Sequence, residues 1–155
     1  MSIDQKLHDL GIVLPTPAAP IANYMPAVVS GNMLVVSGQL ALGAGGVAPE
    51  HKGKLGASVS AEQGTAAARL CAINVLAQAK AELGSLDKIK RVVRLGGYIA
   101  AAPGFTALPA VMNGASDLMV DVFGDKGRHA RTTIGVAGLP LDAAVEVEAM
   151  FEIET

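Results

Sequence analysis

The C-terminal segment 144–153 carries the pattern that most restricts what this chain can fold into. Val145, Val147, Ala149, Phe151 and Ile153 alternate strictly with Glu146, Glu148, Met150, Glu152 and Glu154. A period of two sends successive side chains to opposite faces of a β-strand. The segment is therefore predicted to be a strand with one apolar face in a core. Its carboxylate face is either solvated or turned toward a polar cavity or subunit interface.

Two short runs nearer the N-terminus are typical of a β-hairpin. Residues 27–29 and 33–36 are rich in β-branched and apolar side chains, and they flank Ser30-Gly31-Asn32. A short turn of this chemistry between two such runs favours antiparallel pairing. The glycine-rich stretch 43–58 that follows has little periodicity and is predicted to be a loop.

Two helices are predicted in the middle of the chain. Ser60 and Gln63 have the spacing of a capping box, and the helix that they open is expected to end at Gly84. Apolar residues recur at helical spacing over 105–123 and predict a second helix. Each helix has an apolar stripe that must pack against another layer.

Two further strands complete the expected order of elements. The segment 88–101 alternates in part, with Gly96-Gly97 as a candidate bulge, and 130–136 reads as a strand before the C-terminal one. The order is then hairpin, helix, strand, helix, strand, strand. It predicts an α+β fold with two helices packed on one face of a sheet.

Composition narrows the class of protein further. The 155 residues suffice for one domain, which we place at 23–155 behind an N-terminal arm at 1–22. Apolar residues make up 51% of the chain and charged residues only 17%, so part of the apolar surface is expected to be buried against other subunits. A net charge of −2 argues against nucleic acid or a membrane as partner. One cysteine and no signal-peptide or membrane-spanning pattern predict a cytoplasmic protein.

Arg131 is the leading candidate for a functional cation. Its strand is predicted to place Arg131 and Thr133 on one face, with Thr132 and Ile134 on the other. A planar guanidinium is suited to bidentate capture of a substrate carboxylate. The alternative is a structural ion pair with one of the glutamates of the last strand. His129 is a weaker candidate for a catalytic group.

Three motifs stand in a fixed order along the chain. They are Gly31-Asn32-Met33-Leu34-Val35-Val36-Ser37-Gly38-Gln39, then Ala130-Arg131 followed by Leu139-Pro140, and Val145-Glu146-Val147-Glu148-Ala149. In order and spacing they resemble the reactive intermediate deaminase family, also called RidA or YjgF. The resemblance implies a chorismate-mutase-like fold and a homotrimer with an active site in each cleft between subunits. It implies no metal and no other cofactor.

The resemblance also implies roles for particular residues. Arg131 would bind the substrate carboxylate, Glu146 would position and activate a water, and Tyr24 would close the pocket. Ser37 and Asn113 occupy further substrate-binding positions of the family. From the residues alone, Ser37 could instead bond only to the turn backbone, and Asn113 could cap a neighbouring loop.

The sequence departs from the family pattern at two places near the arginine. Members commonly have a proline just before the Ala-Arg pair and a cysteine two residues beyond the arginine, whereas His129 and Thr133 stand here. Because Thr133 is predicted to share a face with Arg131, it is expected to affect substrate shape or polarity. The loop 42–58 and the arm are longer than the family pattern and are expected to cover the cleft or shift specificity.

The activity that the resemblance implies is hydrolytic deamination of small enamine or imine intermediates of amino-acid metabolism. Substrates of the 2-aminoacrylate type would yield 2-keto acids and ammonia. This reaction needs an anchored anion, an aimed water and a group that handles protons. Two alternatives stay open: non-catalytic binding of a small carboxylate metabolite in the same cleft and, less favoured, an endoribonuclease.

Overall fold

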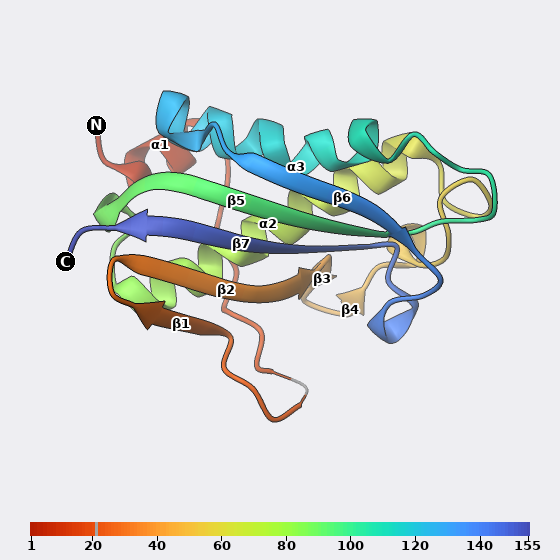
Figure 1. Cartoon of the computed structure of the whole chain (residues 1–155), viewed down its shortest axis with the longest axis horizontal. Helices are drawn as coiled ribbons and strands as arrows, with labels where there is room; N and C mark the ends of the chain where they lie inside the picture. Colours follow the sequence, from red (N-terminus) through yellow and green to blue (C-terminus); the bar gives the residue numbers. More distant parts are fainter. Residues whose placement is uncertain (21) are drawn as a thin grey trace.

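The computed structural model describes residues 1–20 and 22–155. Its α-helices are α1 (Ile3–Asp9), α2 (Ala61–Leu83) and α3 (Leu108–Phe123). Its strands are β1 (Ala27–Ser30), β2 (Met33–Leu40), β3 (Leu42–Gly43), β4 (Gly46–Val47), β5 (Ile89–Ala100), β6 (Ala130–Val136) and β7 (Val145–Ile153). Five of these strands form a sheet in the order β1-β2-β7-β5-β6, and α2 and α3 cover one of its faces (Figure 1). The predicted α+β layer fold is confirmed.

Strand β7 lies inside the sheet, where it pairs antiparallel with both β2 and β5. All five residues of its apolar face are buried in the main core: Val145, Val147, Ala149, Phe151 and Ile153. Between them, Glu146, Glu148 and Glu152 project from the face that the helices leave uncovered. The strict alternation therefore predicted both the strand and the face that it buries.

The start and the end of α2 follow from its sequence. The Gln63 amide donates to Ser60 Oγ at 3.1 Å, and the Ser60 amide donates to Gln63 Oε1 at 2.9 Å, which completes the predicted capping box. Gly84 ends the helix in the left-handed region, with φ of 80°. Helix α3 begins at Leu108 and not at 105, with Pro109 in its first turn, where the missing amide costs nothing.

Strand β6 forms one edge of the sheet and pairs parallel with β5. Parallel neighbours need a crossover, and α3 supplies it. The bulge predicted at Gly96-Gly97 is wrong, because both residues pair in regular register with β7, and the register shifts fall before Arg94. A Cβ at position 96 would lie 2.8 Å from Glu148 Cγ, and one at 97 would meet Met112 at 3.1 Å. The two glycines are there for close packing on both faces.

The stretch 43–58, predicted to be a loop, contains short elements. Its first residues pair as the β3 and β4 hairpin, and a 3₁₀ turn follows at Pro49–His51. Glycine content therefore misled the prediction here, because a two-residue pairing leaves no periodic signal. No helix among residues 1–20 and 22–155 is long and apolar enough to span a membrane.

The N-terminal arm follows the surface of the helix layer. Helix α1 buries Leu7 in the main core, and Lys80 Nζ of α2 lies 2.8 Å from Asp4 Oδ1. Further along, the buried Gln78 of α2 donates its Nε2 hydrogen to the Ala18 carbonyl at 2.7 Å. Within the arm, Ile21 lies outside the described residues. Ala18 is thereby held against the body of the domain.

Candidate functional site

Arg131 is held under helix α3 by three acceptors. Its neighbour in register on β5 is Leu95, which is fully buried, so both side chains point toward the helix layer. Arg131 Nη1 donates to Asn113 Oδ1 at 2.8 Å and to Ser116 Oγ at 3.0 Å, and Nη2 donates to the Pro109 carbonyl at 3.1 Å. Positions 109, 113 and 116 lie on one face of α3. The helix therefore fixes the guanidinium in one orientation.

Arg131 forms no ion pair with a carboxylate within the described part of the chain. The glutamates of β7 lie on the other face of the sheet, where Glu148 meets Arg94 at 3.5 Å and Glu152 meets Lys90 at 3.3 Å. The alternative of a structural ion pair is therefore wrong for Arg131. Three of its five N–H groups are used by the protein, and the Nε hydrogen and one Nη2 hydrogen are left for a ligand.

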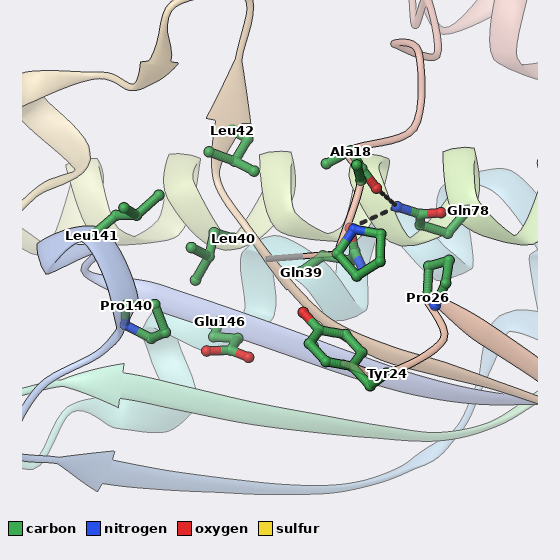
Figure 2. Close-up of a pocket in the computed structure, with 13 residues that line it drawn as sticks. Ala18, Tyr24, Pro26, Gln39, Leu40, Leu42, Gln78, Pro140, Leu141 and Glu146 are labelled. Atoms are coloured by element: carbon green, nitrogen blue, oxygen red, sulfur yellow. Dashed lines mark hydrogen bonds between the residues drawn. The ribbon is translucent and has the colours of Figure 1, made fainter. Parts of the chain in front are cut away.

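Glu146 lines a pocket at the start of β7, and Arg131 does not line this pocket. Tyr24 lies beside it, with Pro140 and Leu141 on one flank and Ala18, Pro26 and Gln78 on the other (Figure 2). A Cβ at Gly38 would overlap the Glu146 carboxylate, so any larger residue there would displace that side chain. The pocket is a small, mostly apolar recess with a single carboxylate in its wall.

The surroundings of Glu146 make its carboxylate more basic. Burial, and to a lesser extent the charge of Glu148, raise the pKa of Glu146 above its ordinary value of 4.5. The same face carries a hydrogen bond from the Tyr98 hydroxyl to Glu148 Oε1 at 2.6 Å, which raises the pKa of Tyr98. A half-buried carboxylate with a raised pKa is suited to taking up a proton from water.

The structure places the other predicted site residues as follows. Asn113 orients Arg131, and does so through its side-chain oxygen. Ser37 donates its hydroxyl to the Met25 carbonyl at 2.7 Å and so ties the segment after Tyr24 to β2. Thr133 shares the face of Arg131 as predicted, but its hydroxyl is buried and makes no hydrogen bond within the described ranges.

Arg131 and Glu146 do not meet within one chain. They project from opposite faces of the sheet. Arg131 on β6 is in register with Leu95 on β5, and Leu95 is in register with Ala149 on β7, which lies three residues beyond Glu146. At about 4.8 Å between strands and 3.3 Å per residue, the two Cα atoms are on the order of 14 Å apart before side chains are counted. A single copy of the chain therefore does not bring both groups into one site.

Sequence reasoning did not identify Ser116, and it did not foresee the contact between Ser116 and His129. Ser116 Oγ lies 2.8 Å from His129 Nε2, and His129 Nδ1 lies 2.6 Å from the Gly127 carbonyl oxygen. The only signal for Ser116 was its spacing of three from Asn113 on the second helix. Across residues 1–20 and 22–155 no three His, Cys, Asp or Glu side chains group as metal ligands.

Comparison with known proteins places this geometry in a family. Residues 4–153 match the family model described as "YjgF/chorismate mutase-like, putative endoribonuclease". The chain therefore belongs to the YjgF family, which includes RidA proteins, and has its chorismate-mutase-like fold. The match begins within the N-terminal arm.

Individual relatives agree with this assignment. Protein TCP17 of Trypanosoma cruzi is 51% identical over 96% of this chain and 92% of its own. The crystal structure of Atu1372 from Agrobacterium tumefaciens superposes with a TM-score of 0.90 at 46% identity, covering 98% of this chain and 92% of that one. RidA from a Psychrobacter species is more distant, with a TM-score of 0.63 and 25% identity, covering 89% of this chain and 94% of that one. The chain thus resembles TCP17 and Atu1372 more than it resembles that RidA.

Proposed function

We propose that this protein hydrolyses small enamine and imine derivatives of amino acids to 2-keto acids and ammonia, in a site formed between two subunits of a homotrimer. The observation that carries the proposal is Arg131, a guanidinium fixed by three protein acceptors with two N–H groups unused and no carboxylate partner among the described residues. An arginine oriented in this way is suited to a carboxylate brought by a ligand.

The uncovered face of the sheet supports assembly with other copies. Val28, Val35 and Ile134 lie on that face and are 49%, 40% and 44% exposed. Aliphatic side chains exposed along a sheet face are typical of a subunit interface. Burying this face against a second copy of the chain would cover the excess apolar surface that the composition predicts. It would also bring the pocket of Glu146 next to β6, the edge strand that carries Arg131, of the second copy.

The proposed reaction needs only groups that the chain supplies. Arg131 of one subunit binds the substrate carboxylate, so that the adjacent C=N carbon faces Glu146 of the next subunit. Glu146 takes a proton from water as the water oxygen bonds to that carbon and passes it to the imine nitrogen, which gives a carbinolamine. Glu146 then moves the hydroxyl proton to the nitrogen as the C–N bond breaks. Ammonia leaves and the carbon becomes a ketone. Tyr24, beside Glu146, limits access of bulk water (Figure 2).

An endoribonuclease, which the family description names, is not favoured by this surface. On the uncovered face of the sheet, Arg94 and Lys90 are paired with Glu148 and Glu152, so these two cations are not free to bind the phosphates of RNA. Binding of a carboxylate metabolite without turnover uses the same Arg131 but leaves the raised pKa of Glu146 without a task.

The test is an assay of keto-acid release. 2-Iminobutanoate is generated in place from threonine with a dehydratase, and hydrolysis above the spontaneous rate is followed through 2-oxobutanoate formation. We expect acceleration by the wild-type protein and none by Arg131→Ala, with both proteins trimeric by sedimentation. Saturable binding of 2-oxobutanoate without acceleration would establish the binding protein instead.

A further inference from the structure

The hydrogen bonds around Arg131 continue beyond its three acceptors. Ser116 Oγ, which accepts from Arg131 Nη1 at 3.0 Å, lies 2.8 Å from His129 Nε2. The other ring nitrogen, Nδ1, lies 2.6 Å from the Gly127 carbonyl oxygen. A single hydrogen-bond network thereby joins helix α3, the turn before β6 and β6 itself.

Hydrogen-bonding chemistry fixes which atom donates and which accepts at each contact of this network. The Gly127 carbonyl can only accept, so Nδ1 of His129 carries a hydrogen, and in the neutral ring Nε2 is then an acceptor. The Ser116 hydroxyl consequently donates to Nε2 and presents its lone pairs to Arg131. In this arrangement every polar atom of the network, from Arg131 Nη1 through Ser116 and His129 to the Gly127 carbonyl, has a hydrogen-bond partner.

The Gly127 end of this hydrogen-bond network is held in place by packing. Gly127 is buried, and a Cβ there would lie 2.6 Å from the Met119 carbonyl carbon of α3. Any larger residue would have to push the turn away from the helix. Close packing of this glycine on the α3 backbone therefore holds the carbonyl that sets the tautomer of His129.

We propose that Ser116 and His129 are positioning residues, which hold the Arg131 guanidinium in the orientation that binds the substrate carboxylate. Neither residue touches the substrate, and the inference rests on the proposed function of Arg131. His129 orients the Ser116 hydroxyl, and Ser116 removes one rotational freedom of the guanidinium. The histidine that replaces the family's usual proline before the Ala-Arg pair thus acquires a role in the site.

The decisive variants are Ser116→Ala, Ser116→Thr and His129→Phe, with the exposed Asp121→Ala on the same helix as a control. Removing one hydrogen bond to a charged group is expected to raise KM for 2-iminobutanoate about tenfold in Ser116→Ala, with kcat within about twofold. Threonine keeps the hydroxyl and should restore KM to within about twofold of wild type. His129→Phe should behave as Ser116→Ala, and Asp121→Ala as wild type.

A spectroscopic readout separates this inference from the proposed function, because it needs no turnover. In wild type, the Nη hydrogens of Arg131 should give resolved, slowly rotating NMR signals, assigned by their loss in Arg131→Lys, and His129 should show the Nδ1–H tautomer. Ser116→Ala should lose the resolved signals and Ser116→Thr should keep them. If Ser116→Ala leaves the Arg131 signals and KM unchanged, or if threonine fails to rescue, the inference is wrong. If wild type shows the signals but hydrolyses no imine, the positioning role stands and the proposed reaction falls.

Discussion

Replacing Arg131 with lysine keeps the positive charge and removes the fork of the guanidinium. The arginine spends three N–H groups on Asn113, Ser116 and Pro109, at 2.8, 3.0 and 3.1 Å, and keeps two for a carboxylate. An ammonium has only three hydrogens in all, on one atom. Lysine can therefore satisfy the helix or grip the substrate, but it cannot do both with bidentate geometry.

The expected loss follows from the number of bonds forfeited. A hydrogen bond to a charged group contributes about 1.5–3 kcal/mol, so losing one of two substrate bonds should lower kcat/KM about ten- to 150-fold. Arg131→Ala loses both bonds, and a fall on the order of 10² to 10⁴ is expected. Stability should change by less than about 1 kcal/mol, because Asn113 and Pro109 are exposed and water can replace the guanidinium.

Steady-state hydrolysis of 2-iminobutanoate and thermal unfolding measure the two effects separately. Arg128→Lys is the matched control, since this neighbouring arginine is exposed and its only ion pair in the described chain is with Asp125 at 3.5 Å. A kcat/KM of the Arg131→Lys variant within twofold of wild type, or an equal loss in Arg128→Lys, would refute the reasoning.

Three further predictions concern the rest of the molecule. Glu146→Gln should abolish hydrolysis and stabilise the fold at neutral pH. Folding raises the pKa of Glu146, so ionisation of this carboxyl group above pH 4.5 lowers the stability of the folded protein relative to the unfolded chain. The gain in Tm of Glu146→Gln over wild type should therefore be larger at pH 7 than at pH 4, and an equal gain at both would contradict it. Gly38→Ala should displace the Glu146 carboxylate and lower kcat with Arg131 unaffected, as 2-oxobutanoate binding at unchanged Kd would show. Ser60→Ala should cost about 1 kcal/mol in urea unfolding through loss of the bond to Gln63 and leave kcat/KM unchanged, whereas a lost activity would tie the cap to the site.

Local patterns made much of the fold predictable. The alternation in β7 and the capping box of α2 are dictated by neighbouring residues, and both appear as expected. The sheet order was not predictable in the same way, because the last strand inserts between β2 and β5, which lie far earlier in the chain. Gly96 and Gly97 misled the prediction for a related reason. Glycine is needed at these positions because tertiary packing brings Glu148 and Met112 close to the backbone there.

The candidate site divides along the same line. Strand alternation placed Arg131 and Thr133 on one face. The family resemblance gave Asn113 as a substrate-binding position, and in the structure its side-chain oxygen accepts a hydrogen bond from Arg131. The contact from Ser116 to His129 joins a helix to a turn thirteen residues later, and no local periodicity signals it. Nor did the sequence reveal that Arg131 and Glu146 project from opposite faces, since that depends on how β5 aligns β6 with β7.

The central claim is that Arg131 of one subunit acts with Glu146 of another, and subunit complementation tests it most directly. Arg131→Ala and Glu146→Gln are each expected to be inactive as pure trimers. When the two are co-expressed in equal amounts and assemble at random, about one site in four should combine an intact Arg131 with an intact Glu146 from the neighbouring chain. Recovery of about a quarter of wild-type activity is the result that we predict. Mixed trimers as inactive as either parent would show that both groups must come from one chain, and would contradict the account.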